Sequence, residues 1–231
     1  MQKYARVLQQ RNSLLKRIQA GAKPRPTSSP SGTRSSPTHG GTIYWARADA
    51  LGHLAIQAEQ QMERLSDGLE SLTLIYRPSI GGLDQYDAPI DDAEWTGRML
   101  KALQAVRQRE IAAGATLVGP HRDDVEVLID GMPADAFASR AQQRTAALAM
   151  RLAEASYLRR ALGDDPVVLA LDDVLSELDA RRRRALLEYI DTFQQTLVTT
   201  ADIPTVSATS TPAPPAASSS TPARITRFEG E

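Results

Sequence analysis

The chain has 231 residues, enough for one or two domains with a sizeable core, and its 42% hydrophobic and 24% charged residues are ordinary for a globular protein. It contains no cysteine, which excludes disulfides and zinc–thiolate sites and is consistent with a cytoplasmic protein. No apolar run approaches the length of a membrane span, and residues 1–20 lack a signal-peptide core, so we expect no membrane association.

The net charge of −1 hides an uneven distribution along the chain. Residues 1–48 contain nine Lys and Arg residues and no acid, and all 28 acidic residues lie from Asp49 onward. A basic segment on an acidic body indicates a local contact with a polyanion such as nucleic acid, although a solvated basic face explains the charge equally well. The candidate nucleic-acid contacts on the first predicted helix are Arg6, Arg11, Lys16 and Arg17.

The first half of the chain is predicted to be mainly helical, because apolar residues recur there at helical spacing. The expected elements are helices at about 2–19 and 44–67, a strand at about 72–77, and a third helix capped by Asp91 or Asp92. Residues 22–42 are rich in Pro, Ser, Thr and Gly, and we expect them to be disordered.

Two short strands, residues 116–118 and 125–130, are predicted to form a hairpin. The loop between them, Gly119–Asp124, contains His121 and Arg122. These two side chains could contact a phosphate, or they could only stabilise the turn.

A long helix is predicted to begin at Ser139 and to end at Gly163. Ser139 and Gln142 fit a capping box, which would contribute roughly 1 kcal/mol to helix stability. The free N–H groups at such a helix start can also bind a phosphate, so the cap position is a candidate anion site. The apolar positions of this helix are Leu148, Leu152, Ala155 and Leu162.

The most informative segment is an apolar run, Val167–Leu171, that leads directly into Asp172 and Asp173. Such a run predicts a strand buried on both faces in a parallel sheet, and carboxylates at its C-terminal end lie where open α/β sheets bind ligands. In nucleotide-hydrolysing folds the first acid holds Mg²⁺ and the second positions or deprotonates the attacking water. The alternative is a polar turn after the strand, with Asp179 only capping a helix at 180–190.

Four segments in order along the chain resemble the RecF family of bacterial replication and recombinational-repair ATPases. They are residues 3–16, 119–124, 139–154 and 171–179, and the resemblance extends from residue 3 to about 202. The family belongs with the ABC/SMC-type head ATPases, in which two heads enclose two nucleotides. The resemblance therefore implies an α/β fold: a mainly helical arm over residues 1–113, and part of an ABC/SMC-type ATPase lobe over 114–231.

The resemblance also implies roles for individual residues, with ATP and Mg²⁺ as cofactors. Asp172 corresponds to the Mg²⁺-associated Walker B acid, Asp173 to the catalytic acid, and Asp179 to the D-loop. Ser139, with Gln142, falls in the signature that reaches the γ-phosphate bound by the opposite subunit of a homodimer. The switch residue near the γ-phosphate is Thr200 or Ala201. Residues 204–223 are expected to be a second disordered insert, and 225–228 an edge strand.

The chain departs from the family pattern at two points. Its four lysines, Lys3, Lys16, Lys23 and Lys101, do not follow a glycine, so the sequence contains no Gly-x-x-x-x-Gly-Lys-Ser/Thr loop to cradle a triphosphate. Ala141 stands where the signature normally has Gly, and its methyl group could crowd a phosphate.

The function implied by the resemblance is ATP-gated binding to gapped DNA or single-strand/double-strand junctions. There the family helps RecO and RecR load recombinase, and its slow hydrolysis acts as a clock. Two alternatives stay open for this chain: a non-enzymatic DNA-binding or assembly module, and one half of a split ATPase completed by a separately encoded lobe.

Overall fold

The structure is a computed structural model that describes residues 2–22, 31–81, 91–163 and 167–200. Its contacts divide the chain into two compact units, each made of discontinuous segments. Unit 1 consists of Met1–His53 and Leu74–Val127, and unit 2 of Leu54–Thr73 and Leu128–Glu231. This division differs from the expected boundary at residues 113 and 114, because one long helix and two strands each contribute to both units.

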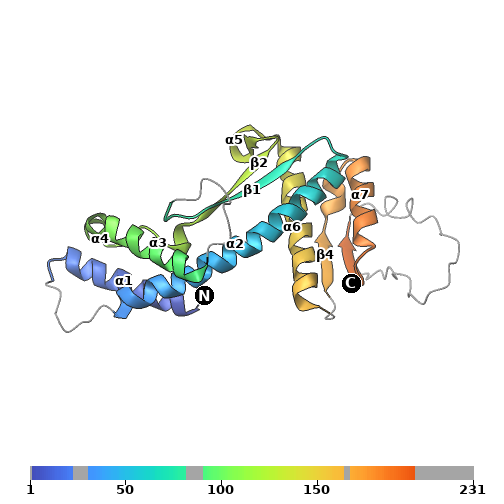
Figure 1. The fold of residues 1–231 in the computed structure, drawn as a ribbon. Helices are drawn as coiled ribbons and strands as arrows, with labels where there is room; N and C mark the ends of the chain where they lie inside the picture. Colours follow the sequence, from blue (N-terminus) through green and yellow to red (C-terminus); the bar gives the residue numbers. More distant parts are fainter. Residues whose placement is uncertain (1, 23–30, 82–90, 164–166, 201–231) are drawn as a thin grey trace, which may run out of the picture. The chain divides into compact units, whose positions relative to one another are not determined.

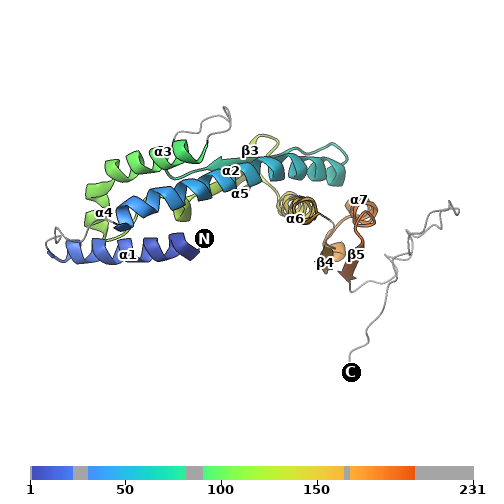
Figure 2. The ribbon, with the colours of Figure 1, turned by 60° about the horizontal axis from the view of Figure 1, so that its bottom comes forward.

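Unit 1 is built mainly from helices that lie alongside one another (Figures 1 and 2). They are α1 (Gln2–Gln19), the first part of α2 (Ser31–Ser66), α3 (Asp92–Ala105) and α4 (Arg107–Ala113). The α1 boundaries are those predicted from the sequence, and Asp91 is the residue that caps α3. The buried core of this unit consists of Tyr4, Tyr44, Tyr76, Trp95, Met99, Leu103 and Val118. Among the described residues, no helix has the length and apolarity needed to cross a membrane.

Helix α2 begins at Ser31, within the segment that the sequence predicted to be disordered up to residue 42. The reason is tertiary packing against α3. A methyl group added at Gly40 would overlap the sulfur of Met99, and the hydroxyl of Thr42 donates a hydrogen bond to Asp92 at 3.1 Å. Contacts of this kind outweigh a weak intrinsic helix propensity. The rest of the predicted insert, residues 23–30, lies outside the described residues, as do the predicted insert at 204–223 and the edge strand at 225–228.

A three-stranded sheet has the order β1-β2-β3. Its strands are β1 (Leu72–Arg77), β2 (Asp124–Ile129) and β3 (Met132–Pro133). The strand at 72–77 was predicted correctly, but the hairpin was not. Residues 116–118 form no strand, and β2 instead pairs with β3 through a tight turn at Asp130 and Gly131, whose φ angles are 51° and 78°. An Asp-Gly pair is the combination that tolerates positive φ at both positions of such a turn.

Unit 2 contains a second sheet, in which β4 (Val168–Asp172) and β5 (Gln195–Thr199) run parallel. Its other elements are α5 (Ala134–Phe137), α6 (Arg140–Leu162), the 3₁₀ helix η2 (Val174–Glu177) and α7 (Ala180–Ile190). Figure 2 shows α6 and α7 on the same side of this sheet.

The burial of β4 differs from the prediction. Leu169 and Leu171 are buried, whereas Val168 is 49% exposed and Leu197 on the neighbouring strand is 56% exposed. The prediction of a strand buried on both faces is therefore wrong for the described residues, because α6 and α7 cover only one face of the sheet. Leu162, which was expected to be apolar core of α6, is 51% exposed in its last turn.

Candidate functional site

The candidate site lies at the carboxyl ends of the parallel strands β4 and β5. Asp172 is the last residue of β4, and the register places it beside Thr199, the last residue of β5. The Thr199 hydroxyl donates a hydrogen bond to Oδ1 of Asp172 at 2.5 Å and accepts one from the backbone N–H of Asp173 at 3.0 Å. One threonine therefore holds both members of the acid pair in position, while both carboxylates are exposed.

Asp173 has a left-handed backbone conformation, with φ of 50°. This conformation costs a non-glycine residue roughly 1 kcal/mol or more, so surrounding contacts must maintain it. Its N–H also bonds to the carbonyl oxygen of Thr199 at 3.2 Å, and its own carbonyl accepts a hydrogen bond from Ser176 at 2.8 Å. The chain consequently turns sharply out of β4 and leaves the Asp173 carboxylate at the surface.

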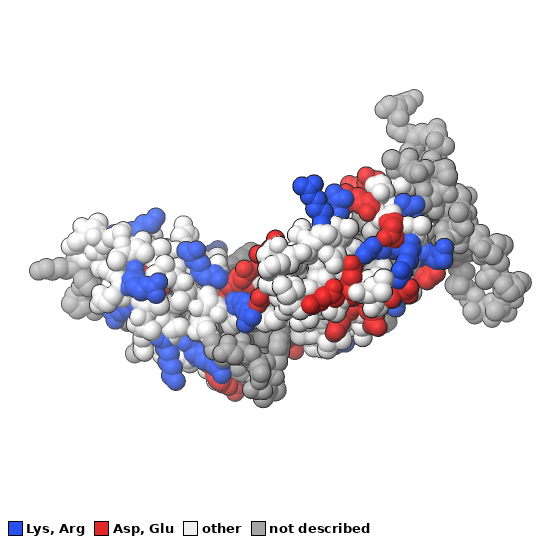
Figure 3. All heavy atoms as spheres, turned by 90° about the horizontal axis from the view of Figure 1, so that it is seen from above, with Lys and Arg blue, Asp and Glu red and all other residues white. Residues whose placement is uncertain are grey.

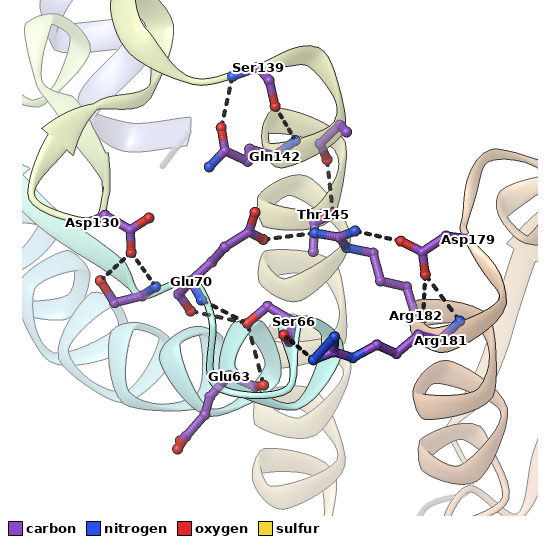
Figure 4. Close-up of polar contacts among 12 residues, drawn as sticks. Glu63, Ser66, Glu70, Asp130, Ser139, Gln142, Thr145, Asp179, Arg181 and Arg182 are labelled. Carbon is purple, nitrogen blue, oxygen red and sulfur yellow. Dashed lines mark hydrogen bonds and ion pairs between the residues drawn. The ribbon is translucent and has the colours of Figure 1, made fainter.

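Ser139 begins α6 in the predicted way (Figure 4). Its hydroxyl accepts a hydrogen bond from the Gln142 N–H at 3.2 Å, and the Gln142 side chain accepts one from the Ser139 N–H at 2.9 Å. The capping box is thus confirmed. Ala141 is exposed on the first turn, and its carbonyl accepts a hydrogen bond from the Thr145 hydroxyl at 2.9 Å, so its methyl group is tolerated within this chain.

One ion pair connects the start of α6 to the segment that follows the acid pair. Arg144 on α6 lies 3.4 Å from Glu177 at the end of η2. Both residues are about half exposed, so the pair contributes little to stability. It nevertheless shows that the first turns of α6 and the Asp173–Glu177 segment are neighbours in unit 2.

Asp179 caps α7, which begins at the predicted residue (Figure 4). Its Oδ1 accepts hydrogen bonds from the N–H groups of Arg181 and Arg182, and its Oδ2 lies 2.6 Å from the Arg182 guanidinium. The N–H bond from Arg182, followed by the guanidinium, holds the pKa of Asp179 below its ordinary value of 3.8. Arg182 also reaches Glu70 at 3.0 Å. The structural role that the sequence left open for Asp179 is confirmed, and its D-loop role stays a proposal.

Replacing Asp179 with Ala should lower the free energy of unfolding by about 1 kcal/mol, because two helix N–H groups lose their acceptor. Since the folded-state pKa of Asp179 is depressed, its stabilisation is fully present above pH 3.8 and is lost as the pH falls through the lower folded value. Urea denaturation at neutral and acidic pH measures both effects. Asp179→Asn is the matched control, since it keeps a capping oxygen. Equal stability of Asp179→Ala and wild type at neutral pH would contradict the assignment.

The four candidate cations of α1 do not share one environment. Arg6, Lys16 and Arg17 are exposed. Arg11 is only 9% exposed and forms a buried ion pair with Glu110, which is fully buried. Its guanidinium also donates to Thr116 at 2.6 Å. Arg11 is therefore committed to the core of unit 1, and three of the four predicted contacts are available to a ligand. On the face seen in Figure 3, Lys and Arg side chains are scattered singly, and Asp and Glu side chains lie beside some of them.

The Gly119–Asp124 loop packs against α1 in unit 1. His121 shares a hydrogen bond with the Tyr4 hydroxyl through Nδ1 at 2.9 Å, and its Nε2 lies 3.3 Å from the Thr116 carbonyl oxygen. A carbonyl only accepts, so the proton lies on Nε2 and the Tyr4 hydroxyl donates to Nδ1. Although part of His121 reaches solvent, burial lowers its pKa below 6.5. The nearby Arg122 lowers it further, whereas the Thr116 bond and Asp123 oppose the shift.

The lowered pKa of His121 predicts a pH-dependent stability. A histidine whose folded pKa is depressed stabilises the fold fully above its ordinary value of 6.5, and this stabilisation is lost as the pH falls through the folded value. We expect the urea midpoint to drop on acidification below pH 6.5, and the drop to shrink in His121→Gln. The exposed His53→Gln is the control, which should retain the wild-type pH dependence. An unchanged pH profile in His121→Gln would refute this explanation.

The sequence did not identify Thr199 as a site residue, and named Thr200 or Ala201 instead. Thr200 is partly buried at the end of the described chain, and Ala201 lies outside it. The register of the two strands could have identified Thr199, since parallel strands of equal length end side by side.

Residues 2–22, 31–81, 91–163 and 167–200 contain no group of three or more His, Cys, Asp or Glu that could hold a metal. An exposed Asp172 still fits Mg²⁺, which binds through one or two carboxylates together with substrate phosphates.

Comparison with known proteins connects this geometry to a family. No protein-family model matches the chain. It is 41% identical over 201 residues to the DNA replication and repair protein RecF of Synechococcus sp. (strain JA-3-3Ab), covering 87% of this chain and 52% of that protein. It is 37% identical over 204 residues to RecF of Bacillus cereus (strain B4264), covering 88% and 53% respectively.

Two solved structures give the same result. The recombination mediator protein RecF-ATPrS in the RecFOR pathway superposes with a TM-score of 0.73 at 30% identity, covering 87% of this chain and 52% of that one. RecF-ATP gives a TM-score of 0.68 at 31% identity with the same coverage. The chain thus spans about half the length of the curated relatives it matches. Over the half that it shares with them, the chain is similar in sequence and in fold to RecF, a DNA replication and repair protein.

Proposed function

We propose that this chain carries the DNA-binding and acid-bearing part of a RecF-type repair protein, and that its nucleotide site is completed by a segment that supplies a phosphate loop. The observation that carries the proposal is the pairing of Asp172 and Thr199 at the ends of two parallel strands, followed by the exposed Asp173. Strand ends of this kind are where α/β sheets bind ligands. The solved RecF relatives named with ATP and ATPrS support a nucleotide as that ligand.

Each residue of the proposed site has a distinct task. Asp172, whose carboxylate accepts a hydrogen bond from the Thr199 hydroxyl, would hold Mg²⁺. Asp173 stands just past the strand end, where it would position or deprotonate the attacking water. ATP supplies the phosphoryl group that is transferred to water. Asp179 and Thr200 are proposed to lie near the nucleotide, as the family pattern implies.

The start of α6 is proposed to act on a second nucleotide. The N–H groups of its first turn and its dipole favour an anion, and Ser139 and Gln142 fix the geometry of that turn. In a dimer, this turn would reach the γ-phosphate held by the opposite subunit. Closure of the two subunits would then depend on ATP. DNA bound by the exposed cations of α1 would be released after hydrolysis.

Within cells, we propose that the protein acts at gapped DNA or single-strand/double-strand junctions with RecO- and RecR-type mediators, to help load recombinase. The RecFOR pathway named for the solved relatives supports this setting. A second candidate is a DNA-binding or assembly module without nucleotide chemistry. That candidate is favoured by the absence of any Gly-x-x-x-x-Gly-Lys-Ser/Thr loop from the sequence.

Reconstitution with the phosphate-loop half of a RecF relative tests the acid assignments. Asp172→Asn should abolish ATP turnover in the mixed assembly, whereas Asp173→Asn should bind ATP and hydrolyse it slowly, trapping the closed dimer. Asp191→Asn, an exposed carboxylate at the end of α7, is the matched control and should leave turnover unchanged.

Thr199 provides a finer test of the same geometry. Thr199→Val removes the hydroxyl that bonds to Asp172 and should reduce turnover, and Thr199→Ser should restore it. Wild-type turnover in both Asp172→Asn and Asp173→Asn would mean that these acids only form a polar turn after the strand. It would then favour a DNA-binding or assembly module without nucleotide chemistry.

A further inference from the structure

The short 3₁₀ helix η1 (Pro120–Arg122) has a feature that the proposed site does not use. Arg122 is exposed, and its side chain makes no hydrogen bond or ion pair with any residue that the structure describes. The other polar groups of this turn are held by partners within unit 1.

Asp123 anchors the turn from its C-terminal side. Its buried carboxylate accepts hydrogen bonds from the hydroxyls of Tyr76 at 2.6 Å and Tyr44 at 3.2 Å, and from the backbone N–H of Ser79 at 2.9 Å. The Arg47 guanidinium lies 3.1 Å from the same carboxylate and neutralises it, and it also bonds to the Pro120 carbonyl. Burial strongly raises the pKa values of Tyr44 and Tyr76, so both hydroxyls remain protonated donors at neutral pH.

Gly119 anchors the turn from its N-terminal side. Its φ of 136° is one that only glycine adopts readily, and a Cβ there would lie 2.5 Å from the Tyr4 hydroxyl oxygen. Its carbonyl accepts a hydrogen bond from the Arg122 N–H at 2.8 Å, which closes the turn. The backbone of Arg122 is therefore fixed, while its side chain is left to solvent.

The turn also lies against α1. Tyr4, which contacts both Gly119 and His121, stands in the first turns of that helix between Lys3 and Arg6. Both of these cations are exposed. Arg122 is thus a further exposed cation of unit 1, on an element that packs against α1 through Tyr4. Of the acids beside it in sequence, Asp123 is buried and neutralised, and Asp124 accepts a hydrogen bond from the Val125 N–H.

We propose that Arg122 is a preorganised contact for a DNA backbone phosphate. An arginine fork matches the geometry of phosphate oxygens, and a fixed backbone reduces the conformational freedom that is lost on binding. This inference rests on the proposed DNA binding by α1 and adds to it a residue on a separate element. A phosphate contact made by a fixed arginine releases counterions as any other does, so it contributes to the salt dependence of binding.

Fluorescence anisotropy of a labelled single-strand/double-strand junction, at salt concentrations from about 50 to 200 mM, tests this contact. Arg122→Gln should weaken binding by up to about tenfold at low salt and reduce the log–log salt slope by about 0.9. Arg122→Lys should restore most of the slope. Lys101→Gln removes the same charge from an exposed position on α3 and should change neither quantity.

Three outcomes would overturn the inference. In the first, Arg122→Gln keeps the wild-type salt slope, while replacement of the exposed α1 cations Arg6, Lys16 and Arg17 by Gln lowers it. The Arg122 contact is then absent, and the proposed DNA binding stands. Equal losses in Arg122→Gln and Lys101→Gln would show an effect of net charge alone. If the wild-type protein binds no DNA at any salt concentration, both the inference and the DNA-binding function on which it rests are wrong.

Discussion

Replacing Glu110 with Ala should lower the free energy of unfolding by about 3–5 kcal/mol, the largest effect that we expect from a single substitution. Glu110 is fully buried, and its Oε2 lies 2.5 Å from the Arg11 guanidinium. Its Oε1 accepts hydrogen bonds from the same guanidinium at 3.1 Å and from the Leu117 N–H at 2.9 Å. Truncation would leave the buried positive charge of Arg11 with only the neutral Thr116 hydroxyl as an acceptor, and the partly buried Leu117 N–H without one. Urea denaturation followed by circular dichroism measures the loss.

The double variant Arg11→Met/Glu110→Leu is the matched control for this prediction. Removing both charges together leaves no unpaired ion, so most of the lost stability should return. Thr116→Val, which removes one hydroxyl acceptor of Arg11, should cost only about 1 kcal/mol. A loss below about 1 kcal/mol in Glu110→Ala would mean that the pair is not buried in the folded protein.

Neutralising the exposed cations of α1 should have the largest effect on DNA binding. The triple variant Arg6→Gln/Lys16→Gln/Arg17→Gln removes up to three phosphate contacts. We therefore expect the log–log salt slope to flatten by up to about 2.7 and the affinity at low salt to fall roughly tenfold or more. Arg11 is left unchanged, because replacing it alone would leave Glu110 buried without its partner and destabilise unit 1, which does not probe the surface.

A triple variant in unit 2 provides the control for net charge. Arg140, Arg160 and Arg184 are exposed, and their replacement by Gln removes the same total charge. This control should bind DNA with nearly the wild-type salt slope in the same anisotropy titration. If the two triple variants lose affinity equally, or if neither does, α1 is not the interface.

Local signals in the sequence predicted the elements that depend on nearest neighbours in the chain. The α1 boundaries, the Ser139 capping box and the start of α7 at Asp179 all follow from helical spacing and capping chemistry, which act over three or four residues. The Asp130-Gly131 pair is also a strong hairpin signal in the sequence. The hairpin prediction failed because it placed the turn at Gly119–Asp124 instead.

Features that depend on long-range packing could not be predicted. The burial of Arg11 requires a partner 99 residues away, and the contact of Thr199 with Asp172 spans 27 residues. The open face of β4 likewise depends on which elements cover the sheet, and an apolar run does not contain that information. Of the candidate site, the acids and the cap were therefore found from the sequence, and the threonine that orients the acid was not.

We propose that this chain presents one part of a nucleotide site, which a phosphate loop supplied by another segment completes. Without a lysine and a cradle of N–H groups, Asp172 and Asp173 offer a triphosphate only negative charge, so electrostatic repulsion opposes binding. Calorimetry with Mg-ATP, alongside a phosphate-release assay on the purified chain, tests this claim most directly. We predict no binding heat at micromolar concentrations, no phosphate release and no ATP-induced dimerisation. A micromolar dissociation constant for the chain alone would contradict the account, because it would require a phosphate site that this structure does not assign.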